Sequence, residues 1–111
     1  MSKFTHLHVH SEYSVLDGMS KIDQLIEKSI RCGMNSLALT DHGNMFGIKT
    51  FADACNKYNS KNHDQKFKPI FGCEAYVAKQ TKSNPDGSRF VTENKENLSG
   101  YHLVLLAKNL T

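Results

Sequence analysis

Residues 4–10 read Phe4-Thr5-His6-Leu7-His8-Val9-His10, and this alternation decides how the fold is interpreted. A period of two is typical of a half-buried β-strand, with Thr5, Leu7 and Val9 on one face and the histidines on the other. Neutral imidazole is a common metal ligand, so the histidine row suggests a metal site. An exposed histidine-rich face is the alternative. An expression tag is disfavoured, because the histidines alternate with core-type residues.

The composition bounds the class of protein. A length of 111 residues corresponds to about one small domain, with 39% hydrophobic and 23% charged residues. The formal charge of +3 does not by itself indicate a nucleic-acid partner. The sequence shows neither a signal-peptide pattern nor an apolar run long enough to cross a membrane. Three widely spaced cysteines fit a reducing compartment, so we expect a cytoplasmic protein with no membrane contact.

Two helices are expected after the first strand. The first has Ser20 as its N-cap and stops at Gly33, with Cys32 on its apolar stripe and therefore in the core. The second carries a stripe with helical spacing: Ile48, Phe51, Ala52, Cys55 and Tyr58.

Three further strands are expected, at residues 35–40, 67–77 and 101–107. Residues 59–66 are read as an exposed loop that contains His63, and residues 79–99 as a long solvated loop. Strands alternating with helices predict an α/β fold with a parallel sheet and crossover helices.

Ligand-type side chains follow several of these strands. In parallel α/β folds, ligands bind at the carboxyl ends of the strands, where His10, Asp41-His42 and Glu74 are expected. His102 would lie at the wrong end of a parallel strand. If residues 101–107 instead run antiparallel to residues 75–78, His102 returns to the side of Glu74.

Imidazoles mixed with the carboxylates of Glu74 and Asp17 suit zinc, manganese or iron better than magnesium or calcium. Two or more such ions a few ångströms apart are a device for phosphoester hydrolysis. We therefore expect a multi-metal hydrolytic site.

The same residues resemble a known family, the PHP (polymerase and histidinol phosphatase) domains. The matching motifs are His8-Val9-His10, Thr40-Asp41-His42-Gly43, Gly72-Cys73-Glu74 and Tyr101-His102-Leu103. The flanking residues resemble those of the PHP domains that lie at the amino terminus of bacterial replicative DNA polymerases. The resembling stretches are Tyr13-Ser14-Val15-Leu16-Asp17-Gly18, Asp41-His42-Gly43-Asn44-Met45-Phe46-Gly47, Glu74-Ala75-Tyr76-Val77 and His102-Leu103-Val104-Leu105-Leu106-Ala107.

The resemblance implies a distorted β/α barrel of seven strands, of which residues 1–111 would form about the first half of a single domain. It also implies up to three divalent ions, zinc, manganese or iron, held by His8, His10, Asp17, His42, Glu74 and His102. His6 matches no ligand position, and we expect it to be hydrogen-bonded inside the barrel. Glu74, His10 and Asp41 are the expected catalytic residues, with Asp41 orienting an imidazole.

The function implied is a phosphoesterase or 3′–5′ exonuclease site within a replicative DNA polymerase, a nucleotidyltransferase. The implied partners are DNA and the other polymerase subunits, and the open last strand predicts self-association of the fragment. Two alternatives stay open: a stand-alone histidinol-phosphatase-like phosphoesterase, and a non-catalytic module of the polymerase.

Overall fold

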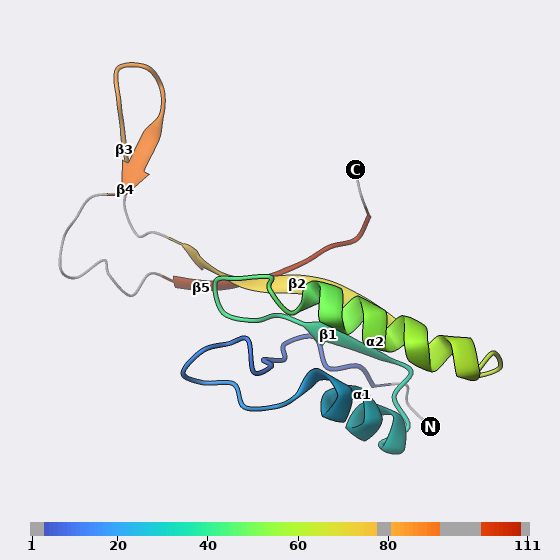
Figure 1. Cartoon of the computed structure of the whole chain (residues 1–111). Coiled ribbons are helices and arrows are strands. Elements are labelled where there is room, and N and C mark those ends of the chain that lie inside the picture. Colours follow the sequence, from blue (N-terminus) through green and yellow to red (C-terminus); the bar gives the residue numbers. More distant parts are fainter. Residues whose placement is uncertain (1–3, 78–80, 92–100, 110–111) are drawn as a thin grey trace.

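The structure, a computed structural model, describes residues 4–77, 81–91 and 101–109 (Figure 1). Within these described ranges, two helices and five strands follow one another: α1 (Ile22–Arg31), β1 (Ser36–Leu39), α2 (Ile48–Lys61), β2 (Lys68–Val77), β3 (Thr81–Ser83), β4 (Arg89–Val91) and β5 (Tyr101–Leu106). In the described part of the chain, no helix is long and apolar enough to cross a membrane.

The main sheet has three strands in the order β1-β2-β5. β1 and β2 are parallel, as their connection through α2 requires, and Leu39 lies beside Phe71. β5 is antiparallel to β2, and Tyr76 lies beside His102 in the register. The sequence-based expectation of strands at residues 35–40, 67–77 and 101–107 is confirmed, as is the antiparallel direction of the last strand.

A glycine permits the close approach of β5 to β2. A Cβ atom built on Gly72 would lie 2.5 Å from the carbonyl oxygen of Leu105 and 2.9 Å from a methyl carbon of Thr40. Because Gly72 has no side chain, β2 can approach both β5 and Thr40, the residue that follows β1.

The predicted strand at residues 4–10 is not a regular strand. The segment runs beside β1, with hydrogen bonds from the Ala38 amide to the His6 carbonyl and from the Thr40 amide to the Val9 carbonyl. The Val9 amide, however, donates to the side-chain hydroxyl of Thr40. In a β-ladder the Val9 amide would donate to a backbone carbonyl instead. The segment is therefore extended but does not form a regular strand.

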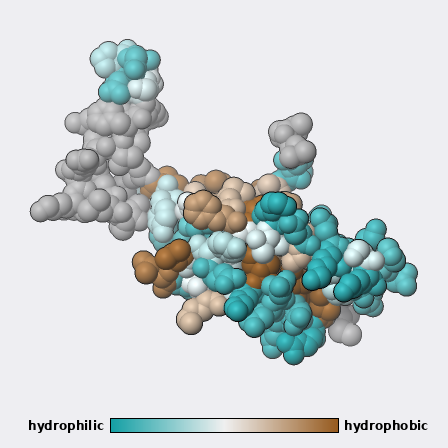
Figure 2. All heavy atoms as spheres, in the orientation of Figure 1, coloured by the Kyte–Doolittle hydropathy of each residue, from teal (hydrophilic) through white to brown (hydrophobic). Residues whose placement is uncertain are grey.

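The core lies between the two helices and the sheet (Figure 1). Both helices present their apolar stripes to it, and its buried members are Ile22, Ile26, Leu37, Leu39, Phe51, Cys55 and Phe67. The exposed surface of α2 is mostly hydrophilic, whereas hydrophobic surface gathers toward the other end, over the sheet and its loops (Figure 2). Burial raises the pKa of the Cys55 thiol to about 12, so this cysteine fills space and stays protonated.

Two details of the first helix differ from expectation. Its N-cap is Lys21, not Ser20, and no side chain caps it. Cys32 is exposed, because it lies just past the end of the helix, where the chain turns away at Gly33 with φ of +79°. The stop at Gly33 is confirmed, since its amide bonds the Ile30 carbonyl in a left-handed conformation that glycine readily adopts.

The expected long loop at residues 79–99 contains structure. β3 and β4 pair as an antiparallel hairpin that projects from the main sheet (Figure 1). Its turn is closed by hydrogen bonds around Asp86-Gly87-Ser88, with Gly87 at φ of +86°. Residues 79–80 and 92–99 of that prediction lie outside the described residues.

Candidate metal centre

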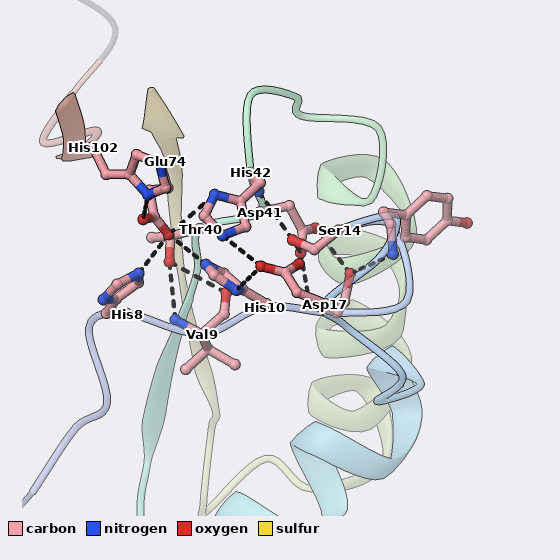
Figure 3. A network of polar contacts seen from close by, with 12 residues as sticks. His8, Val9, His10, Ser14, Asp17, Thr40, Asp41, His42, Glu74 and His102 are labelled. Atoms are coloured by element: carbon pink, nitrogen blue, oxygen red, sulfur yellow. Dashed lines mark hydrogen bonds and ion pairs between the residues drawn. The ribbon is translucent and has the colours of Figure 1, made fainter. Parts of the chain in front are cut away.

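Six side chains with metal-binding chemistry converge at one end of the main sheet (Figure 3). They come from five separate pieces of chain: the extended segment, the loop after it, the end of β1, β2 and β5. The six residues are His8, His10, Asp17, His42, Glu74 and His102.

Backbone pairing explains why they meet. Beyond the end of β1 the chain stays bonded to β2, because the Glu74 amide donates to the Asp41 carbonyl and the Gly43 amide donates to the Glu74 carbonyl. His42 is thereby held next to Glu74. On the other side of β2, Val104 of β5 lies opposite Glu74, which brings His102 into reach.

Glu74 is the centre of the cluster. Its Oε2 atom lies 2.6 Å from Nε2 of His8 and 2.5 Å from Nε2 of His10. Its Oε1 atom lies 2.8 Å from Nδ1 of His102, which confirms the predicted return of that residue. One buried carboxylate thus contacts three imidazoles from two different segments.

The protonation of Glu74 follows from these contacts. Burial alone would raise the pKa of the carboxyl, but hydrogen bonds with His8, His10 and His102 and the field of His42 outweigh burial. Together they lower the pKa from 4.5 to about 2. Glu74 is therefore an anion at any physiological pH and is available as a ligand.

The second carboxylate, Asp17, faces the other side of the cluster. Its Oδ2 atom lies 2.6 Å from Nε2 of His42 and 3.6 Å from Nδ1 of His10. His42 Nδ1 is buried, has no hydrogen-bond partner among the described residues and lies 3.6 Å from Glu74 Oε2. A buried nitrogen without a partner is costly, and a bound cation would satisfy it.

The ligand atoms form three overlapping sets, each with its atoms within 4.8 Å of one another: His8-His10-Glu74, His10-Asp17-His42 and His42-Glu74-His102. Each set combines imidazole nitrogen with carboxylate oxygen, which suits a borderline divalent metal. The donor chemistry, the spacing and the unpartnered nitrogen of His42 all fit a cluster of up to three ions.

Comparison with known proteins assigns the family. The family model described as "PHP domain" matches residues 6–111 of the sequence. The chain belongs to the PHP domain family. PHP domains are generally metal-dependent, and the mixed α/β architecture, with its three-stranded sheet and two helices, is consistent with part of a PHP fold.

Curated relatives of this PHP domain are similar over nearly its whole length. It is 44% identical over 110 residues to DNA polymerase III subunit alpha of Borreliella burgdorferi, and 44% identical over 111 residues to the same subunit of Treponema pallidum. The identity to the subunit of Helicobacter pylori is 42% over 106 residues. These alignments cover 96–97% of the chain but only 7–8% of each relative.

Asp41 acts on different partners from those expected. It was predicted to orient an imidazole, but its buried carboxylate accepts hydrogen bonds from the Ser11 amide at 2.6 Å and from the hydroxyls of Ser11 and Ser14. The Ser14 hydroxyl in turn accepts from the His42 amide. The carboxylate of Asp41 therefore fixes the loop that leads to Asp17, and Ser14 links that carboxylate to the His42 amide (Figure 3).

His6 was predicted to be hydrogen-bonded in the interior, and this prediction is wrong. His6 is exposed, and its ring contacts Phe4 edge to face, with 4.7 Å between ring centroids. It belongs to none of the three ligand sets, as expected. His63 is exposed in the loop after α2, as predicted.

Sequence reasoning overlooked three residues of the site. Ser11 and Ser14 anchor the carboxylate of Asp41, which lies about 30 residues away in the chain, and no local pattern reports that contact. Tyr76 packs against His42 and His102. Its position two residues after Glu74 on a strand was a signal, since such residues share a face.

Proposed function

We propose that this chain is the amino-terminal PHP region of a bacterial replicative DNA polymerase and that its metal centre hydrolyses phosphodiesters in the manner of a 3′–5′ exonuclease. The observation that carries the proposal is a group of three overlapping ligand sets, two of which share one buried, ionised carboxylate, Glu74. The named relatives support the polymerase context, although the chain spans only about 8% of their length.

The chemistry of the site fits this reaction. Zinc, manganese or iron would supply a hydroxide near neutral pH and stabilise the attacking and leaving oxygens of an in-line displacement. The chain's own residues hold the geometry: Glu74 supplies negative charge to two sets, His10 and His42 each serve two sets, and Asp17 completes the set farthest from Glu74. Asp41 keeps the loop of Asp17 in place through Ser11 and Ser14.

The larger context is part of the proposal. The complete domain would be a distorted seven-stranded barrel, and DNA and the other replicase subunits would be its partners, in the cytoplasm. β5 pairs with β2 on one side only in the described part of the chain, so the isolated fragment would self-associate through that open edge.

The test uses the complete gene product. Wild type is compared with the double variant His8→Ala/His10→Ala for zinc and manganese content and for release of nucleotides from the 3′ end of DNA. We expect both metal and hydrolysis to be lost. His6→Ala is the matched control, because His6 lies in the same segment, is exposed and belongs to no ligand set.

Three outcomes would contradict the proposal. Unchanged metal-dependent hydrolysis in the double variant would place the activity elsewhere. A wild-type protein that folds but has no measurable hydrolysis would favour the non-catalytic module. Hydrolysis of small phosphate monoesters but not of DNA would favour the phosphatase branch instead.

A further inference from the structure

Tyr76 lies at the metal centre but belongs to none of its ligand sets. It follows Glu74 by two residues in β2, so the two side chains share one face of the strand. In the register, Tyr76 is the direct partner of His102 on β5. The side chain is 58% exposed and takes no part in the hydrophobic core, so filling the core does not explain it.

The ring of Tyr76 contacts two ligands at once. It is stacked on the imidazole of His42 with 5.9 Å between centroids and an angle of 15° between planes. It meets the imidazole of His102 edge to face at 5.0 Å and 88°. The two imidazoles also meet each other at 5.0 Å and 77°. Three rings thus fix one another's orientation beside Glu74.

The backbone of the neighbouring loop leaves room for this ring. Gly43 directly follows His42 and has a φ of +60°, a conformation that other residues rarely adopt. A Cβ atom on Gly43 would lie 2.8 Å from Cε2 of Tyr76. A glycine at this position therefore permits Tyr76 to pack against His42.

We propose that Tyr76 is a positioning residue for the ion held by His42, Glu74 and His102. The side chain of His102 is 46% exposed, and Glu74 provides its hydrogen bond. An imidazole held at one nitrogen can still swing about that bond, and the Tyr76 ring, which lies edge to face with His102, blocks the swing. The stacked face does the same for His42. The inference rests on the proposed function, because it assumes that the third ligand set binds an ion.

The experiment measures zinc bound per chain, and the dissociation constant of the weakest ion by chelator competition, in the complete gene product. Tyr76→Ala should lose one ion of the cluster, or hold it about 10–100-fold more weakly, as is typical when support for a ligand is removed. The other two ions should stay. Tyr76→Phe keeps the ring and should bind like wild type, whereas Tyr76→Leu keeps bulk without the ring and should resemble Tyr76→Ala.

Phe46→Ala is the matched control. Phe46 is an aromatic residue of the same loop as His42, is 78% exposed and belongs to no ligand set. Zinc binding should be unchanged in this variant. Thermal unfolding of all variants, measured without metal, separates loss of an ion from loss of folding.

The possible outcomes separate the role of Tyr76 from the proposed function on which it rests. If wild type binds three ions and Tyr76→Ala binds them with unchanged affinity, the inference is overturned and the proposed function stands. Equal losses in Tyr76→Phe and Tyr76→Ala would overturn the role of the ring. Failure of the wild type to bind zinc, manganese or iron at all would overturn both.

Discussion

Glu74→Gln is the substitution that most directly probes the electrostatics of the site. Glutamine has nearly the same shape as glutamate, so packing is conserved while the negative charge is removed. In the metal-free protein, that charge is what holds His8, His10 and His102. We therefore expect the variant to fold but to be less stable above about pH 5.

The magnitude follows from the pKa of Glu74. Its fall from 4.5 to about 2 on folding corresponds to at most about 3 kcal/mol of stabilisation. The imidazoles are partly open to water, with 53% of the His8 and 46% of the His102 side chain exposed. Solvent screening then leaves about 1–2 kcal/mol.

The sign of the pH dependence is fixed by the direction of this pKa change. Because folding lowers the pKa, the stabilisation is present above pH 4.5 and is lost as pH falls toward 2. By pH 3.5, about 40% of it should have disappeared. The difference between wild type and Glu74→Gln should therefore narrow over the same range.

The assay is a urea titration of the metal-free complete gene product, with amide exchange in peptides from β2 and β5 as the readout. Measurements at pH 6 and pH 3.5 give the free energy of unfolding at both ends of the window. Glu27→Gln, at an exposed position of α1, is the control and should match wild type. The reasoning is refuted if Glu74→Gln is as stable as wild type at pH 6, or if the difference grows on acidification.

Three further predictions follow from single contacts. Asp17→Asn should cost one ion and leave two, because Asp17 belongs to one ligand set; loss of all three ions by metal analysis would show that the sets are not separable. Gly72→Ala should destabilise the pairing of β5 with β2 by about 1–3 kcal/mol, since the new methyl would meet the Leu105 carbonyl oxygen. An unchanged melting temperature would contradict this. Iodoacetamide at pH 8 should alkylate exposed Cys32 much faster than buried Cys55, as peptide mass spectrometry can measure; equal rates would mean that the core opens readily.

Much of the site could be predicted because it depends on periodicity and chain direction. A period of two placed His8 and His10 on one face, and parallel strands brought His42 and Glu74 to one end of the sheet. The distance of 2.8 Å between His102 and Glu74 confirms that the last strand had to reverse. These features are regular, so a pattern in the sequence reports them.

The rest depends on single contacts between residues far apart in the chain. Residues 4–10 have the alternation of a strand, but one hydrogen bond to the Thr40 side chain takes the place of a ladder bond at Val9. Cys32 continues a helical stripe, but the helix ends one residue earlier. The carboxylate of Asp41 could have faced an imidazole, and two serines in a distant loop occupy it instead.

The central claim is that the three ligand sets bind metal ions, two of them through Glu74. The most direct test is a crystal of the complete gene product soaked in manganese, with anomalous scattering to locate the ions. The account predicts up to three anomalous peaks, the first between His8, His10 and Glu74. A well-ordered site that shows no peak within coordination distance of Glu74 would contradict it.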